Sequence, residues 1–276
     1  MLGRSLNALL SRNPFARPVS LDLPRLDITS PESVASAFRE HEPGLVFHCA
    51  AMTDVDGCER EPGKARNING EGTRIVAEAC QKAGALLVYF STDFVFDGRV
   101  NRPYTEDDQP NPLSIYGASK LAGEKHAQAC PNHLIIRTAW LFGAGRENFI
   151  TKIIARARSG AKITVVDDQN GSPTYTTDLA GGAMALVEKS ARGIFHLTNR
   201  GSCSRHEFAR LIVEMAGIPA EVSPVKTVPA PGIAVRPEHG VLSLEKYESL
   251  TGLPLRPWQD AVADFIARLP KAGAPA

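Results

Sequence analysis

The stretch that decides the fold is ALLVYFSTDFVFDG at residues 85–98, followed by IYGASKLAGEK at residues 115–125. The apolar run ends at the hydroxyl of Thr92, as a buried parallel strand would end at the edge of a sheet. Tyr116 and Lys120 are spaced i, i+4, so a helix over this segment places the phenol and the ammonium on one face. A neighbouring cation favours the phenolate, which predicts a lowered Tyr116 pKa and proton donation to a carbonyl oxygen.

The YxxxK spacing is not specific by itself, because it also occurs in helices that carry an exposed Tyr and a solvated Lys. Two neighbouring features favour the catalytic interpretation. The upstream strand ends in Ser91 and Thr92, and the small residues 117–119 separate Tyr116 from Lys120. Together they are typical of a reductase.

Composition excludes several classes of function. The 276 residues are 43% hydrophobic and 22% charged, with a net charge of +1, so no basic surface for nucleic acid is expected. The apolar runs are far shorter than the roughly 20 residues that span a bilayer. The five cysteines form no CxxC or Cys/His cluster, so neither a disulfide scaffold nor a metal site is expected. A cytoplasmic protein is the resulting expectation.

Residues 1–20, MLGRSLNALLSRNPFARPVS, allow two interpretations. Three arginines, three serines and no acidic residue fit a targeting peptide. The helical spacing of the leucines instead fits the first helix of a nucleotide-binding fold, with PVSLDL (18–23) as the next strand. We favour the second interpretation. Gly3 is then the last glycine of a phosphate-binding loop, and Asp22, 19 positions later, is the acid that meets the ribose. On this interpretation the given sequence lacks the first strand and most of the glycine loop.

The rest of the chain alternates strands and helices. A helix follows the cap Ser30, GLVFHCAA (44–51) reads as a central strand, and residues 67–83 read as a helix stopped by Gly84. The pattern predicts an α/β fold, a Rossmann-type doubly wound parallel sheet with a smaller C-terminal substrate-binding part. The expected dinucleotide-binding domain comprises residues 1–145 and 162–200, and the substrate-binding part comprises residues 146–161 and 201–276.

Further motifs narrow the superfamily. In chain order they are HCAAMTDVDGCE (48–59), VYFSTDFVFDG (88–98), IYGASKLAGE (115–124), RTAWLFG (137–143) and DDQNGSPT (167–174). Over nearly its whole length the chain resembles the dTDP-4-dehydrorhamnose reductase family of the extended short-chain dehydrogenase/reductase superfamily.

The resemblance implies reduction of the C4 ketone of dTDP-4-dehydro-L-rhamnose to dTDP-L-rhamnose, with NADPH or NADH as the cofactor. It implies Tyr116 as the proton donor, Lys120 at the nicotinamide ribose, and Thr92 near the reacting oxygen. The implied cofactor-binding residues are Gly3, Asp22, Asp27, Ile28, Ala51, Met52 and Thr53, together with Tyr116 and Lys120. The implied substrate-binding residues are Thr92, Asp93, Trp140, Gln169 and Arg236. A dTDP-sugar is the expected partner, with no nucleic acid or membrane, and a homodimer is compatible with this picture.

Several of these residues also have a purely structural interpretation. Asp27 and Asp93 could cap turns, and Trp140 could belong to the core. Gln169 could be part of a loop before a helix. Arg236 could be a solvated charge rather than a contact to the diphosphate.

Three departures from the family pattern keep rival functions open. Phe94 stands where the family usually has Tyr, Met52 occupies a position that is often polar or aromatic, and the glycine loop is not in the sequence. One rival is a non-catalytic sugar-nucleotide-binding or regulatory homologue, as the regulatory subunit of methionine adenosyltransferase is. Another is a different nucleotide-sugar reductase or epimerase. Retention of Thr92, Tyr116 and Lys120 favours the reductase.

Overall fold

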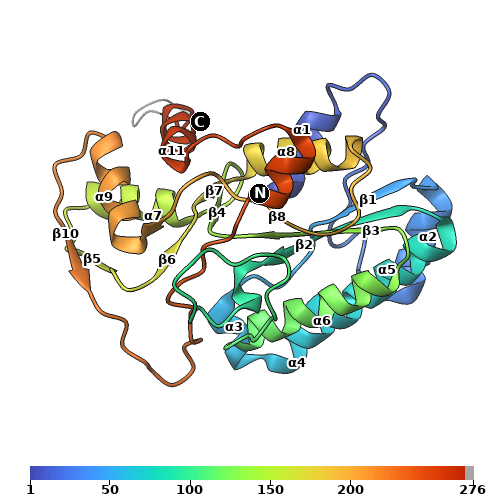
Figure 1. The fold of residues 1–276 in the computed structure, drawn as a ribbon, viewed down its shortest axis with the longest axis horizontal. Coiled ribbons are helices and arrows are strands. Elements are labelled where there is room, and N and C mark those ends of the chain that lie inside the picture. The colour runs from blue at the N-terminus through green and yellow to red at the C-terminus, as the bar shows by residue number, and fades with distance from the viewer. Residues whose placement is uncertain (271–276) are drawn as a thin grey trace.

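A four-stranded parallel sheet organises the molecule, in the order β1-β2-β3-β8 (Figure 1). The computed structural model describes residues 1–270. The strands are β1 (Leu45–His48), β2 (Leu86–Thr92), β3 (His133–Thr138) and β8 (Gly193–His196). All neighbouring pairs are parallel, so their carboxyl ends meet at one edge. The Rossmann-type α/β fold expected from the sequence is confirmed.

Helices cover both faces of this sheet, as the doubly wound arrangement requires (Figure 1). Alternate residues of β2 point to opposite faces, so Leu87 and Tyr89 join one core while Val88 and Phe90 join the other. The first core lies under α2 (Pro31–His41), α5 (Gly72–Ala83) and α6 (Ile115–Ala129). The second lies under α1 (Leu2–Leu10), α8 (Thr176–Glu188) and α10 (Glu245–Thr251).

A separate hydrophobic core supports the rest of the chain. Here β5 (Ile163–Val166) pairs in parallel with β10 (Val222–Val225), and the helices α7 (Phe149–Arg158), α9 (Arg205–Met215) and α11 (Trp258–Ala267) pack around them. The pairing of β5 with β10 differs from the expected grouping of residues 162–200 with the sheet. The two-part division by domain function remains a prediction.

The N-terminal residues form a packed helix. Leu2 and Leu6 are buried against α8, because their i, i+4 spacing puts them on one face. This packing favours the helix of the fold over the targeting peptide. The expectation of a strand at PVSLDL (18–23) is wrong, because these residues form no strand. Val19 is 55% exposed, and among residues 1–270 no strand lies beside this segment to supply the hydrogen bonds that a strand needs.

Strand β1 also differs from its expectation as a central strand. Within residues 1–270 it pairs only with β2, and Leu45, Val46 and Phe47 are half-buried. The remaining elements are short: α3 (Val55–Arg60), α4 (Pro62–Ala65), η1 (Arg66–Glu71), η2 (Asp93–Val95), β4 (Leu141–Phe142), β6 (Asn170–Gly171), β7 (Thr174–Tyr175) and β9 (Cys203–Ser204). No helix within residues 1–270 has the length and apolar character needed to cross a membrane.

Candidate active site

The catalytic helix is fixed to the carboxyl edge of the sheet by its first turn. Ser114 caps α6 by accepting a hydrogen bond from the Gly117 backbone N–H at 3.1 Å. Gly117 packs directly against the carbonyl of Phe94, with no room for a Cβ atom. This close approach holds Tyr116 beside the end of β2, as the motif spacing predicted.

Thr92 and Tyr116, the predicted catalytic pair, meet at the carboxyl end of β2. The Thr92 hydroxyl accepts a hydrogen bond from the Phe94 N–H at 3.2 Å and interacts with the phenol of Tyr116. Burial raises the pKa of Tyr116 well above its ordinary value, and the contact with Thr92 opposes this rise. The phenol is therefore protonated at neutral pH. The Phe94 ring packs edge-on against it, with 5.5 Å between ring centroids.

Lys120 follows one turn later, but it does not lower the Tyr116 pKa as the sequence predicted. Its Nζ lies 4.2 Å from the centroid of the Tyr89 ring. Burial lowers the Lys120 pKa to about 7, while Glu124 and Cys49 oppose this change. The prediction is wrong because burial, which disfavours the charged form of each group, is the largest influence on both pKa values.

The environment of Lys120 fits a bound ribose. Within residues 1–270 its Nζ makes no hydrogen bond or ion pair, although only 4% of the residue is exposed. A buried ammonium without partners is costly, and the hydroxyls of a nicotinamide ribose would supply acceptors. The nicotinamide end of the site thus fits an NAD(P)H cofactor.

Asn69 is a residue of this site that the sequence motifs did not single out. Its side-chain amide accepts from the Met52 N–H at 2.8 Å and donates to the Met52 carbonyl at 3.0 Å. It also donates to the Ser119 hydroxyl at 2.9 Å, and that hydroxyl donates to the Tyr116 carbonyl at 2.8 Å. Asn69 therefore joins the loop after β1, where Ala51, Met52 and Thr53 were predicted to meet the cofactor, to the catalytic helix. Its signal in the sequence was an amide within the buried face of a predicted helix.

The other predicted cofactor residues have structural roles in the fold. Asp27 caps a turn by accepting from the Thr29 N–H at 2.9 Å and the Thr29 hydroxyl at 2.7 Å. Ile28 is buried against Gly72. Gly3 lies on an exposed part of α1 with open space around it, and Asp22 is exposed in a turn, accepting from the Leu23 N–H at 2.9 Å. The roles of these four residues at a cofactor remain predictions.

Asp93 and Trp140, which were predicted to meet the substrate, lie at the carboxyl ends of β2 and β3. Asp93 is buried, accepts a hydrogen bond from Thr92 at 2.9 Å, and packs against Gly240. Burial raises the Asp93 pKa to about 7, against the lowering effects of Thr92 and Arg205. Trp140 has a φ of 47°, a left-handed conformation that is rare for a bulky residue and typical of functional sites.

Arg205, which the sequence motifs did not single out, lies on Trp140. Its guanidinium carbon is 3.5 Å from the centroid of the indole. Ser204 and Glu207 form a capping box, which fixes Arg205 as the first residue of α9. The stacking depends on the tertiary fold, so no local pattern could have predicted it.

Gln169 and Arg236 both hold the segment between β10 and residue 240. The Gln169 amide donates to the Thr227 hydroxyl at 3.0 Å. The Arg236 guanidinium forms an ion pair with both carboxylate oxygens of Asp56, at 3.0 and 2.9 Å. Arg236 is therefore not a solvated charge, and its contact with a diphosphate remains a prediction.

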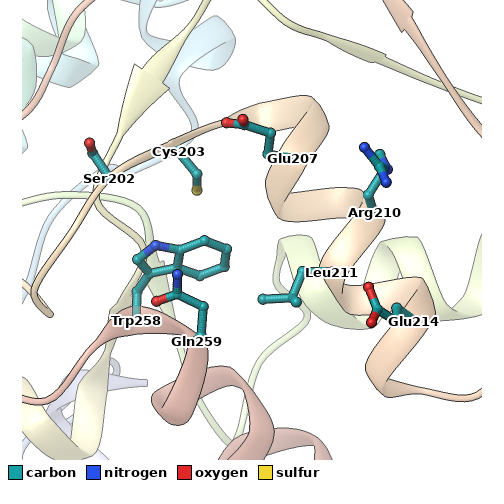
Figure 2. A pocket seen from close by; sticks show the side chains of 8 residues that line it. All are labelled: Ser202, Cys203, Glu207, Arg210, Leu211, Glu214, Trp258 and Gln259. Atoms are coloured by element: carbon teal, nitrogen blue, oxygen red, sulfur yellow. The ribbon is translucent and has the colours of Figure 1, made fainter.

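A hollow of about 300 Å³ lies on another side of α9 and contains none of the predicted residues (Figure 2). It is lined by Ser202, Cys203, Glu207, Arg210, Leu211, Glu214, Trp258 and Gln259. Within residues 1–270 no group of three or more His, Cys, Asp or Glu residues is placed to hold a metal ion.

A Thr–Tyr–Lys set at the carboxyl edge of a Rossmann-type parallel sheet defines the class of the protein: a short-chain dehydrogenase/reductase, an oxidoreductase that uses a nicotinamide cofactor. Comparison with known proteins gives the family. Residues 1–270 match the family described as the RmlD substrate binding domain. The chain belongs to the dTDP-4-dehydrorhamnose reductase family.

Individual relatives agree with this assignment. The dTDP-4-dehydrorhamnose reductase of Streptomyces griseus is 42% identical over 284 residues, covering 100% of this chain and 93% of that protein. The dTDP-4-keto-6-deoxy-D-glucose reductase of Streptomyces niveus is 37% identical over 272 residues, covering 98% and 94%. The structure of dTDP-4-dehydrorhamnose reductase from Bacillus anthracis in complex with NADP has a TM-score of 0.92 at 38% identity, covering 97% of this chain and 95% of that one.

Proposed function

We propose that this protein reduces the C4 ketone of dTDP-4-dehydro-L-rhamnose to dTDP-L-rhamnose with NADPH. The observation that carries the proposal is the pairing of a buried, protonated Tyr116 with Thr92, one helical turn from the unpartnered ammonium of Lys120. A carbonyl needs a proton donor at its oxygen while hydride reaches its carbon, and this arrangement supplies one. The NADP in the Bacillus anthracis relative supports the choice of cofactor.

Each residue has a definite part in the proposed reaction. A bound NADPH supplies the hydride to C4. Tyr116 donates its phenolic proton to O4, because the alkoxide that develops there is far more basic than a phenolate. The Thr92 hydroxyl, which donates to Asp93 in this structure, turns to donate a hydrogen bond to the resulting phenolate, and Lys120 orients the ribose through its free N–H groups. Asn69 holds the loop at Met52 against α6, which keeps the cofactor and the Tyr116 phenol in a fixed relative position.

A second candidate substrate is a different dTDP-4-keto sugar. The Streptomyces niveus relative is named for dTDP-4-keto-6-deoxy-D-glucose, so the sugar differs among relatives of similar identity. In this chain the positions to examine are Phe94, which packs against Tyr116, and Arg205, which stacks on Trp140. Assays with both sugar nucleotides distinguish the two candidates.

The proposal is tested by NADPH consumption. The wild-type protein is expected to consume NADPH in the presence of the 4-keto sugar nucleotide. The reaction is monitored by the loss of NADPH absorbance. Tyr116→Phe removes the proton donor and is expected to lower turnover by roughly 10²- to 10⁴-fold. Tyr175→Phe is the matched control: this buried tyrosine lies in the separate core beside Phe142, and its loss should leave turnover unchanged.

One outcome would reject the reductase. If wild-type protein binds the dTDP-sugar and NADPH but never consumes NADPH, the protein is a non-catalytic homologue.

A cytosolic location belongs to the same proposal, supported by five cysteines that are all free. The homodimer remains a prediction, which light scattering of the purified protein would test.

A further inference from the structure

The guanidinium of Arg205 is stacked but not paired. It lies 3.5 Å from the centroid of the Trp140 indole and 5.3 Å from that of the Phe149 ring. Within residues 1–270 no carboxylate forms an ion pair with it and its side-chain N–H groups have no hydrogen-bond partner. Its backbone N–H donates to the Gln169 carbonyl, at 3.1 Å.

This cation lies on the substrate side of the site. Trp140 contacts both Arg205 and Gly171, where no space is left for a Cβ atom. Next to Gly171, Asn170 accepts a hydrogen bond from the Gly240 N–H at 2.8 Å, and Gly240 packs against the carboxylate of Asp93. The charges of Arg205 and Asp93 influence each other, and burial lowers the Arg205 pKa to about 10. A continuous set of contacts thus connects Arg205 to the residue that follows Thr92.

The position of Arg205 changes how a sugar can meet Trp140. A guanidinium centred over the indole occupies a face on which a sugar ring would otherwise stack. An arginine held flat by an aromatic ring keeps its N–H donors in a fixed plane, so little side-chain entropy is lost when they bind. Arg205 is half-buried, and a partly desolvated charged donor without acceptors is stabilised when a ligand supplies them.

We propose that Arg205 is a specificity-determining residue that donates hydrogen bonds to hydroxyl oxygens of the substrate sugar, near the acceptor Asp93. This inference deepens the proposed function and rests on it. The sugar is favoured over the diphosphate as the target of Arg205 because Asp93 adjoins Thr92. Thr92 in turn contacts Tyr116, the proposed proton donor to O4 of the sugar. A charged donor and an acceptor in the same part of a site distinguish sugars by the positions of their hydroxyls, which apolar stacking does not.

Three variants test this inference. Arg205→Met keeps the length of the side chain but removes every donor, and Arg205→Lys keeps the charge but loses the planar fork. Arg210→Met is the matched control, because Arg210 lies on the same helix but lines the outer hollow (Figure 2). For each protein, KM and kcat for the sugar nucleotide are measured, with calorimetric Kd values for dTDP alone, the sugar nucleotide and NADPH.

The expected result is selective. Arg205→Met should raise KM and Kd for the sugar nucleotide by about 10- to 100-fold, the loss expected for hydrogen bonds from a charged group. The Kd values of Arg205→Met for dTDP and for NADPH should stay within about twofold of the wild-type values. The KM and Kd of Arg205→Lys for the sugar nucleotide should fall between those of Arg205→Met and the wild type, and those of Arg210→Met should match the wild type.

Two results would overturn the inference. A parallel loss of affinity for dTDP and for the sugar nucleotide would place Arg205 at the diphosphate. Unchanged sugar-nucleotide binding in both Arg205 variants would make its role structural. If the wild type binds the sugar nucleotide without consuming NADPH, the proposed reaction fails while the binding comparison still tests Arg205. Should Arg205→Met unfold, Arg205→Lys supplies the same comparison.

Discussion

The pair of Arg137 and Glu124 ties the catalytic helix to the sheet. Arg137 on β3 donates two hydrogen bonds, of 2.9 and 2.8 Å, to the carboxylate of Glu124 on α6. Both side chains are 2% exposed. Glu124 lies four residues after Lys120, so the ion pair fixes the same helix that carries the proposed acid.

Removing one partner of this pair should be far more costly than removing both. Glu124→Leu leaves the Arg137 charge buried and unpaired, which we expect to lower the free energy of unfolding by about 3–5 kcal/mol. Exchanging Arg137 and Glu124 together for leucine should recover most of that loss. The measurement is urea-induced unfolding followed by circular dichroism.

An exposed pair supplies the control for this prediction. Glu147 and Lys152 are 3.3 Å apart with side chains 69% and 63% exposed, so Glu147→Leu should change stability by less than about 1 kcal/mol. Equal losses from Glu124→Leu and Glu147→Leu would contradict the assignment of a buried pair.

At the residue scale, the sequence predicted the parts of the site that depend on local spacing. Thr92, Tyr116 and Lys120 follow from a strand end and one helical turn. The pKa of Tyr116 could not be predicted, because its direction is set by burial from other elements. Arg205 and Asn69 were missed for a related reason, since their partners lie far away in the chain.

At the element scale, the π-type turn η1 is the irregular feature of the site. A π-turn widens a helix locally and occurs often at functional sites. Here it places the fully buried amide of Asn69 between the loop at Met52 and Ser119 of α6. A regular helix would carry this side chain at a different angle along the same face.

Asn69→Ala should loosen both elements that the amide joins. The Met52 N–H loses its partner, while the Met52 carbonyl keeps only the weak contact from the Cys58 thiol at 3.7 Å, and an unsatisfied buried group costs about 1–3 kcal/mol. We expect a lower thermal midpoint and a weaker Kd for NADPH, with the Kd for dTDP nearly unchanged. Asn67→Ala is the control, because Asn67 lies on the same turn but is exposed. A thermal midpoint equal to that of wild type would show that the amide does not hold the loop.

Helices were easier to predict than strands. Ser30, Ser114 and Ser204 each accept the capping hydrogen bond that their sequence context indicates. The strand expected at residues 18–23 is not formed, and β1 lies at an edge. A helix closes its hydrogen bonds within one segment, whereas a strand requires neighbours that a local pattern cannot identify.

At the scale of the whole molecule, two buried histidines make the fold sensitive to acid. His48 contacts the Thr73 hydroxyl at 3.1 Å, and His196 contacts the Tyr104 carbonyl at 3.1 Å. Burial lowers the pKa of each to about 3, from an ordinary value of 6.5. Both rings are therefore neutral in the folded protein well below pH 6.5.

This shift gives stability a definite dependence on pH. Between pH 6.5 and 3 the unfolded chain binds a proton at His48 that the folded protein does not, so stability falls as the pH falls. His48→Gln removes this group and keeps an amide to bond Thr73. The stability of the variant, measured by urea unfolding at several pH values, should fall less steeply over that window. Parallel curves for variant and wild type would contradict the shifted pKa.

The separation of the site between two cores has a consequence for how such enzymes diverge. Thr92, Tyr116 and Lys120 belong to the sheet and its covering helix, whereas Arg205 enters from α9, which packs in the other core. With the proposed role of Arg205, a mutation that alters sugar preference can arise in one half while Tyr116 and Lys120 in the other half stay unchanged. A new deoxysugar preference then needs few substitutions, none of them in the helix that carries the proposed acid.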